Sequence, residues 1–157
     1  MEAFKLDRNL AHLAVLQRIE LTTSFQKKIR KLFGRYLFSK VFSKYMLDLD
    51  KVSKDYYRIM HNEYLTIKKF IKPNQNILSI GAGIGGLEVI INDSFKNEKF
   101  TFIERDFVSK KIRYGWDNEN SEAYNKLNLL ENFLLSNLVQ SDKFKIINFD
   151  TIIFDTT

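Results

Sequence analysis

The chain has 157 residues, 45% of them hydrophobic, and a net charge of +6, which suits one globular domain with a single core and excludes a disordered chain. It contains no cysteine and only two histidines, which excludes disulfides, zinc–thiolate sites and a histidine-rich metal site, so we expect no metal. Its apolar runs are shorter than the about 18 residues of a transmembrane helix, and its charged first residues do not form a signal peptide, so we expect a cytoplasmic protein.

The positive charge is concentrated in the first half of the chain. Residues 1–72 carry 16 basic and 7 acidic side chains, whereas residues 73–157 carry 9 basic and 12 acidic ones. We interpret the excess as a solvated helical surface; the alternative is a surface for an anionic substrate, nucleic acid or membrane, of which a nucleic-acid partner is not expected. The stretch 27–45 is basic, aromatic and amphipathic. Such a stretch usually packs on a neighbouring helix, and the alternative is contact with an anionic membrane surface.

Residues 1–72 are predicted to form an N-terminal helical segment. Apolar side chains recur there at helical spacing, with breaks at residues 22–24, at Gly34 and at residues 48–50. The last helix of the segment should cover residues 52–71, because Tyr, Met, Ile and Phe side chains line one of its faces. We expect this segment to form one domain with the rest of the chain.

The only proline, Pro73, ends the helical segment, and residues 73–157 then alternate between strands and helices. Strands are predicted at residues 77–80, 100–104 and 143–148, and a further β-like run at 151–154. Helices are predicted from the glycine-rich stretch to Phe95, at 107–113 and at 121–139. Ser121 is the predicted N-cap of the last helix. This alternation is typical of an α/β fold in which neighbouring strands are parallel.

The most informative motif follows the first predicted strand. Gly81, Gly83 and Gly86 satisfy the pattern G-x-G-x-x-G, in which glycines turn the chain tightly and let a ligand approach the backbone. Glu104 ends the second predicted strand, 21 residues after Gly83, where its carboxylate can accept both hydroxyl groups of a ribose. The alternatives are a glycine turn that only packs helix against strand, and a solvated acid at the strand end.

Two classes of ligand fit this motif. A dinucleotide places its pyrophosphate at the helix N-terminus. S-adenosylmethionine places its amino-acid end near the glycine turn and its ribose on the acid of the second strand, and it carries no phosphate that would need the helix dipole.

The motif and its flanks resemble class I S-adenosylmethionine-dependent methyltransferases. The resemblance covers residues 56–150 and rests on the runs Asn-Ile-Leu-Ser-Ile-Gly-Ala-Gly-Ile-Gly-Gly-Leu-Glu, Phe-Ile-Glu-Arg-Asp and Lys-Ile-Ile-Asn-Phe-Asp. It implies a Rossmann-like, mostly parallel sheet with helices on both faces, and transfer of a methyl group to a small hydroxyl-bearing acceptor. The runs Tyr-Gly-Trp-Asp and Ala-Tyr-Asn also resemble putative sugar O-methyltransferases, which makes a sugar the first acceptor to consider.

Site residues carry over by position. The resemblance implies that Gly81, Gly83 and Gly85 line the methionine end of the cofactor, that Glu104 binds its ribose, and that Asp150 lies near its adenine. Ser79 occupies the position at which the family often has an acid that holds the cofactor ammonium. A hydroxyl group accepts a hydrogen bond there but supplies no charge.

Three further residues are candidates for the chemistry of methyl transfer. His61 is the best-placed base in the sequence for taking the proton of an acceptor hydroxyl, although a histidine on such a helix more often packs or caps. Tyr114 and Trp116 are candidates for stacking on the substrate or on adenine. Their alternative is a loop folded onto the sheet.

The fold that the motif indicates is not completed. Only Phe149 and Asp150 separate the predicted strand 143–148 from the run 151–154, and a parallel crossover needs about a dozen residues. We therefore expect one long bent strand or a tight hairpin, a shortened domain without a fourth parallel strand, and an exposed sheet edge that favours a homo-oligomer. Two other functions stay open: a nicotinamide-dependent oxidoreductase domain, and a non-catalytic interaction module that uses the basic N-terminal helices.

Overall fold

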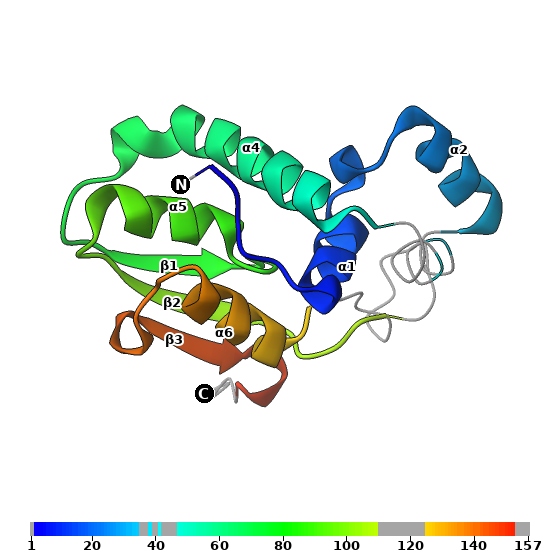
Figure 1. Cartoon of the computed structure of the whole chain (residues 1–157). Helices are drawn as coiled ribbons and strands as arrows, with labels where there is room; N and C mark the ends of the chain where they lie inside the picture. Colours follow the sequence, from blue (N-terminus) through cyan, green and yellow to red (C-terminus); the bar gives the residue numbers. More distant parts are fainter. Residues whose placement is uncertain (1, 35–37, 39–40, 42–46, 110–124, 153–157) are drawn as a thin grey trace.

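The computed structural model describes residues 2–34, 38, 41, 47–109 and 125–152 (Figure 1). Its helices are α1 (Arg8–Gln17), α2 (Ser24–Phe33), α4 (Leu49–Ile67), α5 (Gly86–Phe95) and α6 (Leu127–Ser136), and its strands are β1 (Asn76–Ile80), β2 (Lys99–Glu104) and β3 (Phe144–Asn148). Short 3₁₀ turns cover Ile19–Leu21, Lys68–Phe70, Ser141–Lys143 and Phe149–Thr151. Among these described helices none is both long enough and apolar enough to span a bilayer.

The N-terminal helices begin at side chains that cap them. Asp7 accepts a hydrogen bond from the backbone of Leu10 at the start of α1, and Asp48 accepts one from Lys51 at the start of α4. At α2, Thr23 and Gln26 form a reciprocal capping box. The Asp48 cap explains why α4 begins at residue 49, three residues before the predicted start.

The three strands form one parallel sheet in the order β1-β2-β3, which confirms the predicted α/β class. The register pairs Ser79 with Phe102 and Ile103 with Ile147. Because the order is sequential, both crossovers step in the same direction and deliver their helices to the same face of the sheet.

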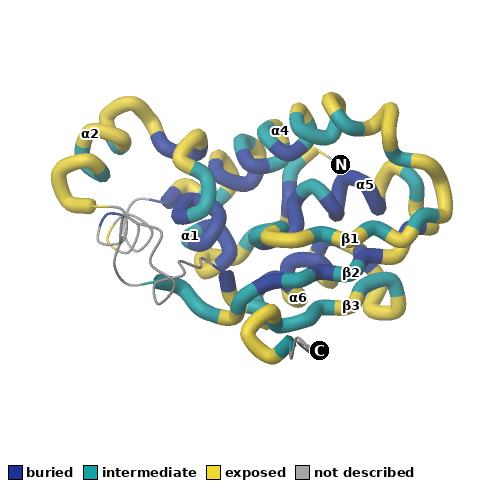
Figure 2. Tube along the Cα trace, turned by 180° about the vertical axis from the view of Figure 1, so that it is seen from behind, coloured by how far each residue is buried: buried dark blue, intermediate teal, exposed yellow. Residues whose placement is uncertain are grey.

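The prediction of helices on both faces therefore does not hold for the part of the chain that the structure describes. The second face is bare, with Leu78 58% exposed and Ile80 71% exposed on β1 (Figure 2). All-parallel sheets are normally covered on both sides, so this sheet is incomplete, as the sequence indicates. Its β1 edge is also unpaired within the described sheet.

The hydrophobic core lies between the covered face of the sheet and the helices, and it draws on residues both before and after Pro73. Phe4, ahead of α1, packs between Tyr56 of α4 and Phe133 of α6, with a ring-centroid separation of 5.2 Å to each. Asn137, just after α6, accepts a hydrogen bond from the Lys5 amide at 2.8 Å and donates one to the Lys5 carbonyl at 3.2 Å. The segment ahead of α1 is thereby joined to the end of α6.

Three predicted elements need correction. Residues 107–109 are not helical and contain a single β-bridge at Val108, and the rest of the helix predicted at 107–113 lies outside the described residues. The helix expected at 121–139 begins only at Leu127, with Lys126 as its N-cap, because Asn125 is drawn into the glycine loop as described below. Ser121, predicted to be that cap, lies outside the described residues.

The third correction concerns the end of β3. Residues 149–151 form a 3₁₀ turn, and Ile152 follows it without strand pairing, so the described part of 151–154 is neither a bent continuation of β3 nor a hairpin. The turn forms because Asn148 accepts a hydrogen bond from the Asp150 amide at 3.0 Å, and Thr151 donates one to the Asn148 carbonyl at 2.9 Å. These local bonds replace the sheet ladder.

Candidate functional site

A cleft of about 460 Å³ opens where β1 and β2 end. The end of α1, the interior of α4, the glycine turn, the end of β2 and the residue after β3 contribute to its walls. The lining residues are Gln17, Arg18, Tyr56, Ile80, Gly81, Ala82, Gly83, Ile103, Glu104, Arg105, Asn125 and Phe149. Its size falls within the about 300–1,000 Å³ of small-molecule sites, and the carboxyl edge of a parallel sheet is where α/β folds bind ligands.

The glycine turn is held by side chains from three directions. Gly83 has φ +65°, and its amide donates to Glu104 Oε1 at 2.7 Å. The Asn125 side chain donates to the Gly83 carbonyl at 2.5 Å. Gln17 lies over the turn so closely that a Cβ at Gly83 would come within 2.5 Å of its Oε1. Gly83 and Glu104, both predicted as site residues, are thus in direct contact, while Gln17 and Asn125 were not predicted.

Glu104 is held largely out of solvent at the floor of the cleft. Its residue exposure is 8%, and burial raises the pKa of its carboxyl, although hydrogen bonds from Gly83, Asn125 and the Arg105 backbone oppose that shift. A carboxylate so placed is an acceptor with a fixed orientation, which suits recognition of hydroxyl groups. It is not a solvated strand-end acid.

Ser79 points to the covered face of the sheet and donates its hydroxyl hydrogen to Glu88 Oε1. Glu88 lies in the first turn of α5, is 4% exposed, and has a second carboxylate oxygen without a hydrogen-bond partner. Burial raises its pKa. Glu88 was not predicted as a site residue; the available signal was one acid inside the apolar run from Leu87 to Ile91.

The last two glycines of the motif face helices instead of the cleft. A Cβ at Gly85 would lie 3.0 Å from Leu130 of α6. A Cβ at Gly86 would lie 2.7 Å from both Met60 Cγ and Tyr56 Oη of α4. Tyr56 also forms a hydrogen bond with the Gly86 backbone, and burial raises the pKa of its hydroxyl. The N-terminus of α5 is therefore packed against α4, and Gly85 is not among the residues that line the cleft.

Both arginines of the cleft form ion pairs with acids beside it. Arg18 pairs with Glu63 of α4 through two contacts, at 2.7 and 3.1 Å. Arg105 pairs with Asp150 at 3.3 Å, and its guanidinium lies 5.2 Å from the centroid of the Phe149 ring. Asp150 thus adjoins the cleft through Arg105, and its charge is already partnered.

The remaining predicted residues do not reach the cleft or are not described. His61 packs on α4 between Tyr57, at 5.7 Å between ring centroids, and Tyr64, at 6.2 Å, and it does not line the cleft. Tyr114 and Trp116 lie outside the described residues. Within the described part, no group of three or more His, Asp or Glu side chains is arranged to hold a metal ion.

Comparisons with protein-family models, with curated proteins and with solved structures find no match to this chain.

Proposed function

We propose that this chain is an S-adenosylmethionine-dependent methyltransferase domain that acts on a small hydroxyl-bearing acceptor, with a sugar as the first class to test. The proposal rests on the sequence resemblance together with the cleft at the glycine turn. The single observation that carries it is the packing of Tyr56 and Met60 against Gly86.

That packing bears on the choice between the two ligand classes. A dinucleotide needs the first amides of the helix after the glycine turn for its pyrophosphate. Here the Gly86 backbone is engaged by Tyr56, and the buried Glu88 lies in the same first turn. A pyrophosphate would meet a wall of α4 and a nearby carboxyl group. S-adenosylmethionine has no phosphate and carries a positive sulfonium, so neither feature opposes it.

The residues that line the cleft match the polar parts of that cofactor. Glu104 would accept the ribose hydroxyls, the backbone of Gly81 and Gly83 would border the methionine end, and Phe149 with the Arg105–Asp150 pair would border the adenine. When bound, the cofactor supplies a methyl group already activated on sulfur, so the protein has to orient the acceptor and keep water out. The proposal assigns no role to His61.

The decisive experiment is calorimetric titration of the protein with S-adenosylhomocysteine and, separately, with NADH. We expect binding of the adenosyl ligand and none of NADH. Glu104→Gln should weaken the binding of S-adenosylhomocysteine by about 10- to 100-fold, because hydrogen bonds to a charged acceptor contribute about 1.5–3 kcal/mol. Glu131→Gln is the matched control, since Glu131 lies on the exposed side of α6 and should leave binding unchanged. Binding of NADH alone would sink the proposal in favour of the oxidoreductase.

The non-catalytic alternative is favoured by one observation. Gln17 covers Gly83, and Glu104 bonds to the same residue, so the chain's own side chains occupy part of the space at the turn. If this closure is permanent, neither ligand binds, and Gln17→Ala does not restore binding. If Gln17 is a cover that a ligand displaces, Gln17→Ala binds S-adenosylhomocysteine more tightly than the wild type does.

A further inference from the structure

The chain between Glu20 and Asp48 has an unusual charge pattern. Residues 21–47 contain seven Lys and Arg side chains and no acidic side chain. Helix α2 lies in this stretch and carries four of these charges in ten residues, with its own capping box at Thr23. Neither the cleft nor the proposed function uses this helix.

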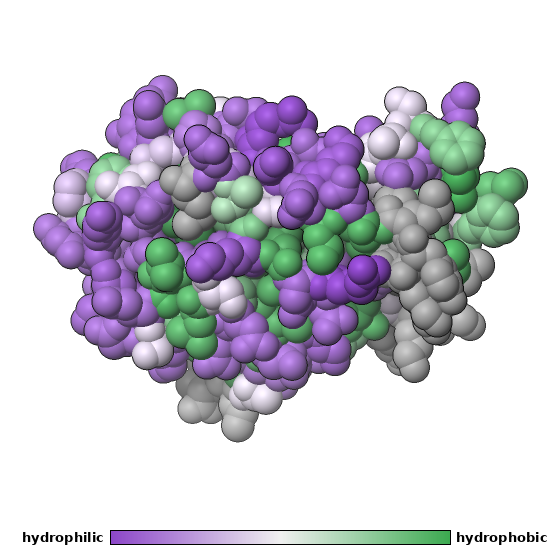
Figure 3. All heavy atoms as spheres, viewed as in Figure 1, coloured by the Kyte–Doolittle hydropathy of each residue, from purple (hydrophilic) through white to green (hydrophobic). Residues whose placement is uncertain are grey.

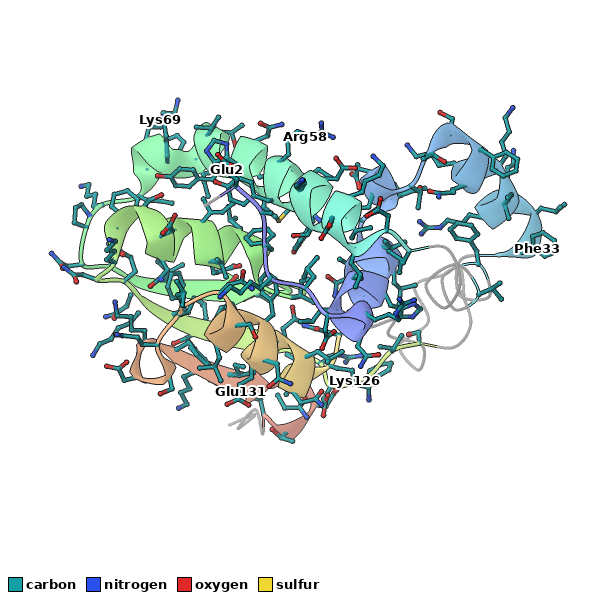
Figure 4. The ribbon with its side chains drawn as sticks, viewed as in Figure 1. Glu2, Phe33, Arg58, Lys69, Lys126 and Glu131 are labelled. Atoms are coloured by element: carbon teal, nitrogen blue, oxygen red, sulfur yellow. The ribbon has the colours of Figure 1, made fainter. Side chains whose placement is uncertain are left out.

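Helix α2 stands out from the body of the protein (Figure 1). It has no fully buried residue. Ile29 is its partly buried apolar contact with the core, whereas Phe25 is 68% exposed and Leu32 is 80% exposed. Apolar side chains gather at its outer end (Figure 3), and Phe33 lies at the tip far from the sheet (Figure 4). Large apolar side chains at this exposure are costly in water unless a partner covers them.

The exposed face combines apolar and basic groups at helical spacing. Phe25, Lys28 and Leu32 follow one another at intervals of three and four residues, which places them on the same side of the helix. Lys27 and Lys31 extend the basic region around the helix from this side. An amphipathic helix with large apolar side chains and lysines on its polar flank is suited to the boundary between lipid headgroups and acyl chains.

We propose that α2 docks this protein on an anionic membrane surface, with Phe25 and Leu32 entering the headgroup–acyl boundary and Lys27, Lys28 and Lys31 contacting the lipid phosphates. Charge complementarity selects the occupant, because the stretch 21–47 offers no acid to an opposing basic partner. A nucleic acid would meet the lysines but leave Phe25 and Leu32 in water. A lipid surface satisfies both sets of side chains at once.

The test is flotation of the full chain with vesicles, at low and high salt. Vesicles of phosphatidylcholine with about 30% phosphatidylglycerol should bind the protein, and vesicles of phosphatidylcholine alone should not, since each lysine near an anionic surface contributes about a fivefold gain in partitioning. Binding to the anionic vesicles should fall as salt rises. Because the readout needs no cofactor, it stands or falls independently of the proposed function.

Variants separate the two contributions. Phe25→Ser with Leu32→Ser should lower vesicle binding by about tenfold or more for each side chain, since each loses the burial of a large apolar group. Lys27→Gln, Lys28→Gln and Lys31→Gln together should lower it about a hundredfold. The matched control is Leu135→Ser on the exposed side of α6, which should leave binding unchanged. All of these positions are exposed, so circular dichroism and thermal unfolding should match the wild type.

Four outcomes would overturn the proposal. They are absence of binding to anionic vesicles, equal binding to neutral ones, an equal loss in the Leu135→Ser control, and a dimer in light scattering that Phe25→Ser dissolves, which would make a second copy the occupant of α2. Binding of a DNA duplex that survives the apolar substitutions while vesicle binding is absent would assign the helix to nucleic acid instead.

Discussion

The contact between α4 and α5 makes Gly86→Ala the most informative substitution in this protein. A Cβ added at this position would lie 2.7 Å from Met60 Cγ, 2.7 Å from Tyr56 Oη and 2.8 Å from Tyr56 Cζ. All three distances are shorter than Cβ contacts in real proteins, and both neighbours are 2% exposed. The two helices must therefore separate, or the two side chains must leave their positions.

The magnitude follows from two opposing effects. Overpacking of a filled core costs about 1–3 kcal/mol. Alanine gains up to about 1 kcal/mol over glycine inside a helix, but residue 86 is the first residue of α5, where that gain is smaller. Because both neighbours are almost fully buried, we expect a net loss of about 2 kcal/mol in the free energy of unfolding. For a chain of this size that corresponds to a fall of about 4–8 °C in Tm.

Urea denaturation of four proteins measures this: the wild type, Gly86→Ala, Met60→Ala and the double variant. Met60→Ala alone should be destabilising by about 2–5 kcal/mol. In its background the alanine at residue 86 should cost less, since one of the atoms it meets is gone, and the two changes should be non-additive by about 1 kcal/mol. A Gly86→Ala protein as stable as the wild type, or strict additivity, would refute the reasoning. It would also remove the ground for preferring S-adenosylmethionine to a dinucleotide.

Three other outcomes are expected. Glu88→Gln should gain stability relative to the wild type as pH rises above about 4.3, the ordinary pKa of glutamate. Burial raises the pKa of Glu88 in the folded state, so the stabilisation present in its protonated form is lost as pH rises through that raised pKa. A stability difference independent of pH would contradict this. Asn137→Ala should lower the free energy of unfolding by about 2–4 kcal/mol and speed hydrogen exchange at the Lys5 amide, since the Asn137 side chain makes hydrogen bonds at 2.8, 2.9 and 3.2 Å; unchanged exchange would show that the N-terminal contact is dispensable. If the bare β1 edge drives self-association, light scattering should show a dimer at high protein concentration that Ile80→Lys converts to a monomer, and a monomeric wild type would end that prediction.

Sequence patterns predicted the parts of the fold that depend on local chemistry. The alternation of apolar runs located the three strands and the helices α4, α5 and α6 in the right order. Pro73 marked the change from helices to strands, and the glycine spacing located the turn at the cleft. The position of Glu104 near the glycine turn also followed from the sequence, because the end of β2 lies next to the end of β1, whereas its hydrogen bond with the Gly83 amide was not predicted.

The errors arose where tertiary contacts decide. The sequence around Asn148 does not distinguish a 3₁₀ turn from a continued strand. The strand β3 ends there because the Asn148 side chain accepts a hydrogen bond from the Asp150 amide. Gln17 and Asn125 reach the cleft from far along the chain in either direction, and nothing local to either residue indicates the Gly83 contact. Glu88 was detectable as an acid in an apolar run, but its partner Ser79 becomes evident only when α5 packs on β1.

Coverage of the sheet was a topological matter. Helices reach both faces of a parallel sheet only where the strand order reverses. In the described sheet the strand order is sequential from β1 to β3 and does not reverse. A motif at the first strand indicates the family of folds but does not say how many crossovers follow on each side. Among the described residues no helix covers the face around Leu78 and Ile80, because both described crossovers lie on the other side of the sheet.

The hydrogen bonds between Asn137 and Lys5 join residues 132 positions apart, and this has a consequence for how the protein reaches its native state. The unit from α4 to β2 can assemble from contacts that are short in sequence. Helix α1, which supplies Gln17 to the cleft and is followed directly by Arg18, docks against α4 and α6. Since α6 follows α1 in the chain at a long distance, α1 must wait during translation until α6 has been made. Docking of α1 on α6 joins residues far apart in the sequence and completes the cleft. We therefore expect formation of the cleft to be the slowest step of folding.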